Sequence, residues 1–290
     1  MIPYFPQPSI DLGPVTIHAF GVIVTAAVLI GLEVARRRLR HLGLDMTLSD
    51  RLAGWTLIGG FLGAHLFAVL LYVPEKVAAD PFVLLKVWEH LSSFGGILGG
   101  LLGLWIFVRV RVGLDRANCG RYLDAVAYAF PVALLVGRFA CTVAHDHPGS
   151  LTRMPLAVSL AAEPARVFIR GVYAAAGRVT ELPADPELAR VGFHDLGWYE
   201  FLYLGLVVVP ITLWLGRRSR PAGTFVVSFV LLYMPVRFAL DFLRVSDVRY
   251  AGLTPAQWVA LIAVLLLAAS VVWRRTRVAR AGTPNESFHE

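Results

Sequence analysis

Long apolar stretches alternate with short polar segments along almost the whole chain. Seven of these stretches reach or approach the ~17 to 25 residues that a helix needs to cross the hydrocarbon core of a bilayer. They lie at about 15–35, 52–73, 94–110, 122–142, 198–216, 222–243 and 256–273. The pattern therefore predicts an all-α integral membrane protein with seven transmembrane helices.

One polar connection is much longer than the others. Residues 143–197 are rich in proline, alanine, glycine and charge, and they predict a small periplasmic cap between the fourth and fifth helices. The expected organisation is a block of four transmembrane helices, the cap, a block of three helices and a cytoplasmic tail. The ranges of these four parts are 1–142, 143–197, 198–273 and 274–290.

The composition supports a membrane protein. The chain is 57% hydrophobic and only 16% charged, with a mean hydropathy of +0.65, whereas a soluble domain carries ~25% charged residues. The first 14 residues contain no basic segment. We therefore expect the first span to be retained rather than cleaved as a signal peptide.

Basic residues are distributed unevenly between the two sides of the expected membrane. With the long connection left aside, sixteen Lys and Arg fall on one side and four on the other. By the positive-inside rule, the amino terminus lies outside and the carboxyl terminus lies in the cytosol. The net charge of +7 comes largely from this cytosolic collar. A basic collar suits anionic lipid, and no nucleic-acid partner is expected.

Only two basic residues, Arg138 and Arg237, fall well inside the apolar stretches, since Arg109 stands at the very end of the third stretch. A guanidinium at the bilayer centre costs at least ~2.5 to 3.5 kcal/mol and cannot lose its proton, so each arginine needs a partner or an anionic ligand. For Arg237, an internal ion pair with Asp241 is one interpretation, and Tyr233 and Arg244 share the same helical face. That pair does not account for Arg138.

Other ionisable side chains are expected at the same level near the outer surface. Glu200 begins the fifth span and is a natural partner for an arginine, while His18, His145 and His194 lie near the outer ends of other segments. These positions predict a shared pocket in the outer leaflet. Because two guanidiniums can each bind a phosphodiester through two parallel contacts, the expected ligand is a phospholipid head group.

Several short motifs occur in one order along the chain. They are Gly13-Pro14 with His18-Ala19-Phe20-Gly21, Ser93-Phe94-Gly95-Gly96, Gly137-Arg138, His194 through Tyr199-Glu200, Tyr233-xxx-Arg237-xxx-Asp241-xx-Arg244, and Gly252-Leu253-Thr254-xx-Gln257. In this order the sequence resembles the bacterial prolipoprotein diacylglyceryl transferases over nearly its whole length.

The resemblance implies an enzyme of the bacterial inner membrane that needs no cofactor. Its substrates would be phosphatidylglycerol, a membrane lipid, and the lipobox cysteine of a lipoprotein precursor, with glycerol phosphate released. Arg138 and Arg237 would hold the phosphate and stabilise the leaving group. The expected surrounding and substrate-binding residues are Glu200, Asp241, Arg244, Tyr233, Gly95, Gly96 and His18.

The sequence departs from that family beside the arginines. Members usually carry His, the favoured catalytic base, where Phe94 stands, Tyr where Phe20 stands, and Asn where Cys141 stands. A further Asn of the family corresponds to Ala144, and a Gly-Glu pair of the family corresponds to His145-Asp146. An Arg that is common in the second helix corresponds to His65. The base must then come from elsewhere. The candidates are His145, His194, His147 and His18, and we assign the first two to catalysis.

The segment from His145 to Ser150, with sequence HDHPGS, has three interpretations. It could be a polar turn, a new acid/base centre or a metal site. Two histidines and one aspartate within three residues do not by themselves set tetrahedral ligation, so we expect no metal. Cys141 is either a small apolar residue or a nucleophile beside Arg138.

Two other classes of function compete with the transferase. One is a non-catalytic lipid-binding or lipid-translocating relative that retains the two arginines. The other is a solute transporter or channel, which is less consistent with the sequence because it contains neither an inverted repeat nor polar residues across the full membrane.

Overall fold

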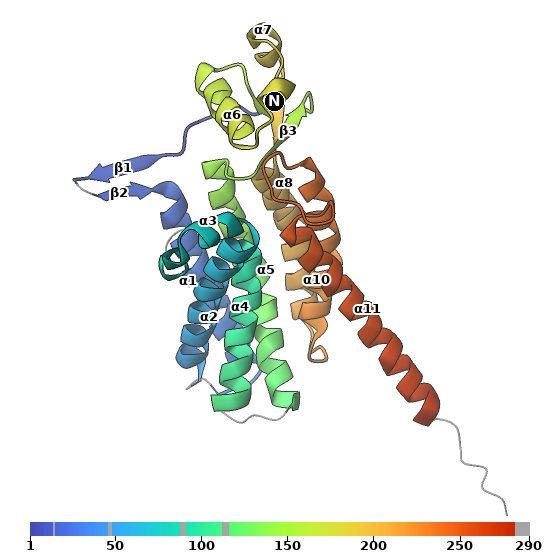
Figure 1. Ribbon diagram of the computed structural model, residues 1–290. Coiled ribbons are helices and arrows are strands. Elements are labelled where there is room, and N and C mark those ends of the chain that lie inside the picture. Colours follow the sequence, from blue (N-terminus) through green and yellow to red (C-terminus); the bar gives the residue numbers. More distant parts are fainter. Residues whose placement is uncertain (14, 46–47, 88–90, 112–115, 282–290) are drawn as a thin grey trace, which may run out of the picture.

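The computed structural model describes residues 1–13, 15–45, 48–87, 91–111 and 116–281. A body of long helices carries a small head at one end (Figure 1). The principal helices are α1 Ala19–His41, α2 Ser49–Leu71, α4 Ser93–Ile106, α5 Arg116–Ala144, α8 Leu196–Tyr203, α9 Val209–Gly216, α10 Thr224–Leu240 and α11 Pro255–Ala281. Single turns extend α4 (Phe107–Arg111) and α10 (Asp241–Leu243), and the π-helical turn Leu204–Val208 joins α8 to α9.

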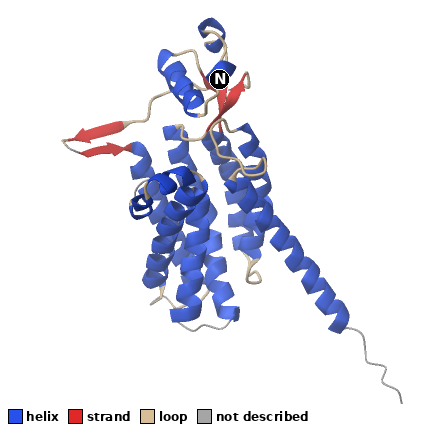
Figure 2. Ribbon diagram, viewed as in Figure 1, coloured by secondary structure: helices blue, strands red, loops and turns tan. Residues whose placement is uncertain are grey.

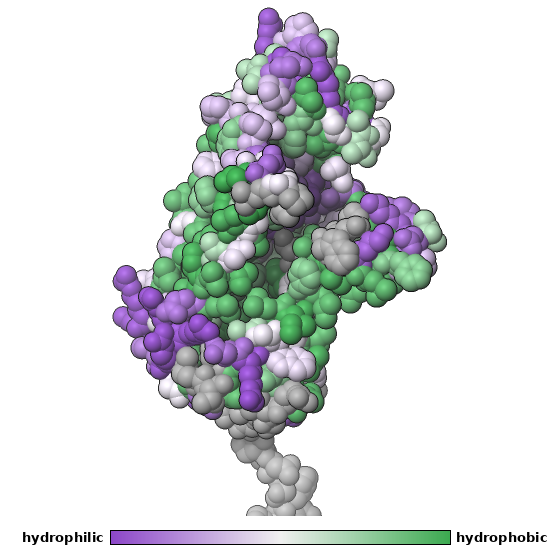
Figure 3. All heavy atoms as spheres, turned by 90° about the vertical axis from the view of Figure 1, so that its left-hand side faces the viewer, coloured by the Kyte–Doolittle hydropathy of each residue, from purple (hydrophilic) through white to green (hydrophobic). Residues whose placement is uncertain are grey.

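The helices confirm the prediction of an integral membrane protein. Five are long and apolar enough to cross a membrane, namely 19–41, 50–71, 120–144, 196–216 and 224–243, and two shorter apolar helices cover 94–110 and 255–271. Each of the seven predicted apolar stretches contains a helix among the described residues, while residues 15–18 of the first stretch form a strand. On the face shown in Figure 3, hydrophobic residues cover much of the body, and hydrophilic residues gather on the head and at the lower left.

The head contains short strands as well as helices, which the all-helical prediction lacked (Figure 2). Its sheet has the order β3-β5-β4, from Pro148–Thr152, Gly192–Asp195 and Val158–Ser159, and both neighbours of β5 are antiparallel to it. Helices α6 (Glu163–Ala175) and α7 (Asp185–Leu188) lie between β4 and β5 in the sequence and contribute to the same hydrophobic core. Ile169 and Phe193 lie in the core of the head. A separate hairpin, β1 Ser9–Leu12 with β2 Val15–His18, extends from the first helix as an arm (Figure 1).

Helices α2 and α4 pack through glycines. A Cβ atom added to Gly99 would lie only 2.2 Å from the carbonyl oxygen of Gly59, and one added to Gly63 would lie 2.6 Å from the Cα of Gly99. Gly95 is just as close to α2, since its Cβ would lie 2.3 Å from the carbonyl oxygen of Gly63. Small residues allow helix backbones to approach closely in a membrane, where dispersion contacts drive association.

One arginine, Arg38, is buried at the end of the helical body away from the head. The sequence pattern ended the first span before Arg38, but α1 continues to His41 and Arg38 is buried. Its guanidinium donates to the carbonyl oxygen of Gly216 at 3.0 Å and lies 4.7 Å from the centre of the Tyr128 ring. Burial between an aromatic face and a carbonyl explains how a charged residue can continue this helix.

The last helix extends into the predicted cytoplasmic tail. That tail was expected at residues 274–290, and α11 continues through Ala281. The remainder, 282–290, lies outside the described residues.

Candidate functional site

The site lies where α5, α8 and α10 meet beneath the head. Arg138 of α5 and Arg237 of α10 are each 2% exposed and face one carboxylate, that of Glu200 at the start of α8. The Nε atom of Arg138 lies 2.9 Å from Glu200 Oε2, and the Nη1 atom of Arg237 lies 2.8 Å from Oε1. Two cations from distant parts of the chain therefore share one buried anion, and neither guanidinium is left without a counter-charge.

Tyr233 completes this centre from α10. Its hydroxyl donates to Glu200 and accepts from Arg138 Nη2 at 3.4 Å. The ring of Phe94, in α4, lies 5.5 Å from the guanidinium carbon of Arg237. The Nε–H of Arg237 is buried and has no hydrogen-bond partner within the part of the chain that is described. A buried donor without an acceptor is costly, and it leaves Arg237 able to bind an additional anionic oxygen.

Asp241 links Arg237 to the start of α11. One oxygen of Asp241 lies 2.9 Å from Arg237 Nη1, and the other accepts from the Thr254 hydroxyl at 2.5 Å. Thr254 and Gln257 form a capping box, because the backbone N–H of each donates to the side chain of the other, at 2.9 and 3.1 Å. The Thr-x-x-Gln spacing before an apolar run is the signature of this motif. The helix cap thus fixes the carboxylate that holds Arg237.

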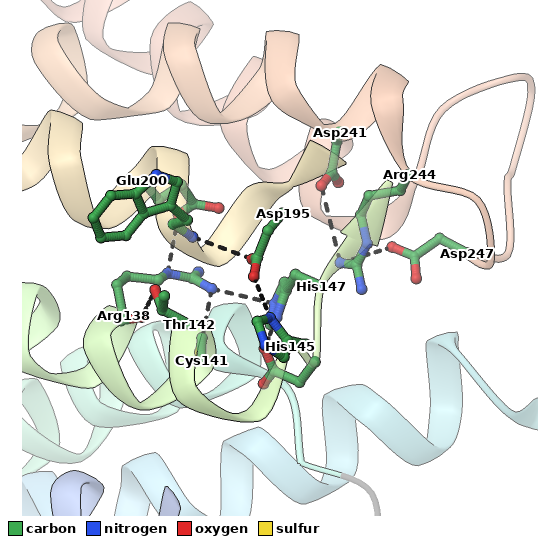
Figure 4. Close-up of polar contacts among 12 residues, drawn as sticks. Arg138, Cys141, Thr142, His145, His147, Asp195, Glu200, Asp241, Arg244 and Asp247 are labelled. Atoms are coloured by element: carbon green, nitrogen blue, oxygen red, sulfur yellow. Dashed lines mark hydrogen bonds and ion pairs between the residues drawn. The ribbon is translucent and has the colours of Figure 1, made fainter. Parts of the chain in front are cut away.

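Arg244 continues the ion-pair network toward the head. Its Nη1 atom lies 3.0 Å from Asp247 and 3.9 Å from Asp241 (Figure 4). The backbone of Arg244 also bridges to Gly149 in β3. Burial raises the pKa of Asp247 above its ordinary value, and the charge of Arg244 opposes that rise. Arg244 therefore connects the end of α10 to the first strand of the head.

The end of α5 turns two neighbouring histidines in different directions. His145 has a left-handed backbone, with φ of 49°, and the N–H groups of His145 and Asp146 bond to the carbonyls of Thr142 and Cys141, each at 3.4 Å. This is a Schellman-type helix end, which favours glycine at the left-handed position. The chain then folds back so that His147 contacts Arg138, while His145 contacts Asp195 (Figure 4) and its ring lies near Phe193 of the head.

His147 contacts the arginine centre directly. Its Nε2 atom lies 3.2 Å from Arg138 Nη1, and its Nδ1 atom bonds to the carboxylate of Asp146. Burial lowers the pKa of His147 below that of an exposed histidine, although Asp146 opposes this effect. Burial raises the pKa of Asp146, but the charges of His147 and Arg138 outweigh it and keep the value below the ordinary one. The lowered pKa favours the neutral form of the imidazole, which can accept a proton.

His145 contacts a different carboxylate. Its Nδ1 atom lies 2.6 Å from Asp195 Oδ2, and its ring stacks on that of Tyr4 with 5.0 Å between centres. The other oxygen of Asp195 accepts from the backbone N–H of Trp198 at 3.2 Å and so caps α8. Asp195 thus couples the loop that follows α5 to the helix that carries Glu200.

The remaining predicted residues lie around this centre or away from it. His194 is paired with Tyr199, with Nδ1 2.9 Å from the hydroxyl, and burial lowers its pKa. His18 is exposed at the base of the arm, where it lines an open depression with Phe20. Gly95 and Gly96 face α2, where their contacts are those of helix packing.

Three residues that contribute to the site were absent from the sequence-based assignment. They are Asp195, Asp247 and Thr254. Thr254 could be recognised from its capping-box spacing, whereas the two aspartates occur in ordinary polar connections and carry no comparable signal. The assembled site combines guanidinium donors with an imidazole beside them, and the Nε–H groups of Arg237 and Arg244 have no hydrogen-bond partner among the described residues. In Figure 3 the hydrophilic surface continues into a recess at the junction of head and body.

Comparison with known proteins agrees with this chemistry. The chain matches the family model described as prolipoprotein diacylglyceryl transferase over residues 7–273. A protein of Chromohalobacter salexigens named phosphatidylglycerol--prolipoprotein diacylglyceryl transferase is 29% identical over 273 residues, which are 92% of this chain and 91% of the relative. Proteins of the same name from Xanthomonas oryzae and Thermus thermophilus are each 32% identical, over 89% and 80% of this chain and 86% and 81% of theirs.

Proposed function

This chain belongs to the prolipoprotein diacylglyceryl transferase family, and we propose on that basis that it transfers the diacylglyceryl group of phosphatidylglycerol to the cysteine thiol of a lipoprotein precursor. It is then a transferase of the bacterial inner membrane. The observation that carries the proposal is the burial of Arg138 and Arg237 on the two oxygens of Glu200. A buried pair of cations beneath a polar head is suited to the phosphate of a lipid whose tails remain in the bilayer.

The proposed topology has seven spans. The five long apolar helices and the two shorter ones support this number, and the basic residues at the end away from the head support a cytosolic position for that end. The head, residues 143–197, then faces the periplasm together with the amino terminus, and the carboxyl terminus lies in the cytosol. The arginines consequently lie in the outer leaflet, beside the phosphate of the outer lipid layer.

Charge develops on the phosphate during the proposed reaction. The thiolate sulfur forms a bond to the terminal glyceryl carbon of the diacylglyceryl group, and the bond between that carbon and the phosphate oxygen breaks. The phosphodiester, with one negative charge, leaves as glycerol phosphate with up to two. Fixed cations that meet this additional charge stabilise the transition state more than the bound lipid. Arg138 and the unpartnered Nε–H of Arg237 supply those contacts.

We propose His147 as the base that takes the thiol proton, since Phe94 cannot do so. His147 is the histidine in contact with Arg138, and Asp146 orients its ring in the manner of a histidine–carboxylate pair. His145 and His194, which the sequence nominated for catalysis, then have supporting roles through Asp195 and Tyr199. Tyr233, Asp241 and Arg244 hold the arginines in position, and His18, Gly95 and Gly96 act in lipid access and helix packing.

The transfer can be tested with purified protein, phosphatidylglycerol vesicles and a synthetic lipobox peptide. Mass spectrometry should show the peptide heavier by one diacylglyceryl group, and a matched peptide with serine in place of cysteine should stay unmodified. Binding of the lipid without any modified peptide would instead favour the non-catalytic lipid-binding relative.

A further inference from the structure

Three side chains of metal-binding types converge where α5 ends. The Sγ atom of Cys141, a carboxylate oxygen of Asp146 and a ring nitrogen of His147 all lie within 4.8 Å of one another. Cys141 is buried, whereas the side chains of Asp146 and His147 are 34% and 13% exposed. The cluster is therefore open to solvent at Asp146 and His147, and the Cys141 thiol lies on its buried side.

The backbone holds two of these ligands together. In a Schellman-type helix end, the third residue before the C-cap packs against the second residue after the C-cap. Both residues are commonly apolar. Here these positions are Cys141 and Asp146, which also share a backbone hydrogen bond of 3.4 Å. A thiol and a carboxylate thus meet at positions where apolar side chains usually pack, and His147 follows immediately.

The ligand set indicates which metal would bind. Thiolate, imidazole and carboxylate together suit Zn²⁺, with bonds of ~2.0 to 2.3 Å that leave tetrahedral ligand atoms ~3.3 to 3.8 Å apart. Small side-chain rotations would bring the three atoms to that spacing. Calcium and magnesium prefer oxygen ligands and make poor use of a thiol. Three protein ligands leave the fourth position of a tetrahedral site open to water.

From the sequence we expected no metal, because His145, Asp146 and His147 alone did not define a site. The structure gives a different set of three candidate ligands. His145 contacts Asp195 instead, and Cys141 lies beside Asp146 and His147. We propose that Cys141, Asp146 and His147 form a zinc-binding site beside the arginine centre, and that zinc there inhibits the transfer. Binding releases the thiol proton, and the imidazole keeps its single proton on the nitrogen that does not bind the metal.

Zinc binding is incompatible with the contact between Arg138 and His147. If zinc binds Nδ1, the ring proton moves to Nε2, where it opposes the N–H of Arg138 that now lies 3.2 Å away. If zinc binds Nε2, it displaces that N–H directly. In both cases His147 leaves Arg138 and can no longer accept a proton from the thiol. This inhibitory half of the inference rests on the proposed function, whereas the binding half does not.

Arg138 also sets the strength of binding. Its Nη1 atom lies 3.7 Å from the sulfur of Cys141, so a positive charge already occupies the neighbourhood of the ion. Repulsion between the guanidinium and Zn²⁺ makes the site weaker than a structural zinc site, and chelation should empty it readily. Such a site is suited to reversible inhibition.

Zinc binding is tested on the full-length protein in detergent, after removal of metals, by calorimetric titration with ZnCl₂ alone. Wild type and Cys119→Ser, which retains the three ligands, should bind one ion with the same affinity, and Cys141→Asn should bind at least tenfold more weakly at that site. Co²⁺ provides a second measurement, since a thiolate ligand gives a charge-transfer absorption that Cys141→Asn should lose. Equal binding by wild type and Cys141→Asn, or Co²⁺ bound without that absorption, would overturn the site.

Inhibition is tested by comparing the transfer rate of each protein with and without ZnCl₂. The wild-type rate should fall at least tenfold at saturating zinc and recover with EDTA, while Cys141→Asn should keep the same rate in both conditions. Equal inhibition of the two proteins would overturn the inhibitory role. Wild type that binds one zinc but transfers no lipid even in EDTA would contradict the proposed function and leave the zinc site established.

Discussion

Arg138 and Arg237 approach the two different oxygens of the Glu200 carboxylate, at 2.9 and 2.8 Å. Each arginine alone would be a buried charge, and each was expected to need an anion. One carboxylate serves both. The two guanidiniums are therefore fixed relative to each other, which under the proposed function preorganises them for the lipid phosphate.

Glu200→Gln should destabilise the protein strongly, because the amide leaves two buried guanidiniums without their shared charge. Removal of one partner from a buried ion pair costs ~3 to 5 kcal/mol. The measurement is the thermal unfolding midpoint in detergent. Glu181→Gln is the matched control, since Glu181 and Arg178 form an exposed ion pair, and exposed pairs contribute little to stability. Similar midpoint shifts for the two variants would show that Glu200 does not hold the arginines.

His147 should give the transfer reaction a characteristic dependence on pH. The base must be neutral, so kcat/KM should rise with pH through the pKa of His147, which burial places below the ordinary ~6.5. The negative charge of Asp146 favours the protonated ring, so its removal lowers the pKa further. Asp146→Asn should therefore shift the acid limb of the pH profile to lower pH. A limb that stays in place, or moves upward, would argue against this pair.

Asp195 should couple the loop after α5 to α8. His145→Gln and Asp195→Asn each remove one partner of the 2.6 Å contact, and the second variant also weakens the cap on Trp198. A double-mutant cycle on unfolding free energy should give a coupling of ~1 kcal/mol or more, since the pair is buried. Strictly additive effects would mean that the contact contributes nothing to the position of α8.

Gly99→Ala should disrupt the packing of α4 on α2. The new methyl group would lie 2.2 Å from the carbonyl oxygen of Gly59, and because that atom is backbone, the helices must separate. Overpacking of this kind costs ~1 to 3 kcal/mol. In Gly54→Ala the new methyl group meets nothing within 4 Å, so this variant is the control and should be neutral or slightly stabilising. Equal unfolding midpoints for the two variants would contradict the close approach of the helices.

The apolar pattern was sufficient to locate the helices, because hydrophobic length is a strong signal in a membrane protein. It was less reliable at helix ends. Arg38 appeared to lie outside the first span, yet a carbonyl and aromatic rings accommodate it inside α1. Burial of a charge by residues far away in the chain cannot be read from local polarity.

The site could be anticipated in part. The need of Arg138 and Arg237 for an anion, and the suitability of Glu200 as a partner, followed from their positions in the spans. The different contacts of His145 and His147 did not, because they depend on a left-handed backbone at His145 that directs the two side chains differently. A histidine at that position gives no local indication of such a turn, whereas a glycine would have.

The central claim is that Arg138 and Arg237 together stabilise the departing glycerol phosphate. The most direct measurement is the rate of glycerol phosphate release from phosphatidylglycerol in the presence of lipobox peptide, for wild type, Arg138→Lys and Arg237→Lys. Lysine keeps the charge but lacks the planar set of donors, so each variant should lose ~100-fold or more in kcat, with one glycerol phosphate released per modified peptide in wild type. Wild-type rates in both folded variants, or release without peptide modification, would contradict the account.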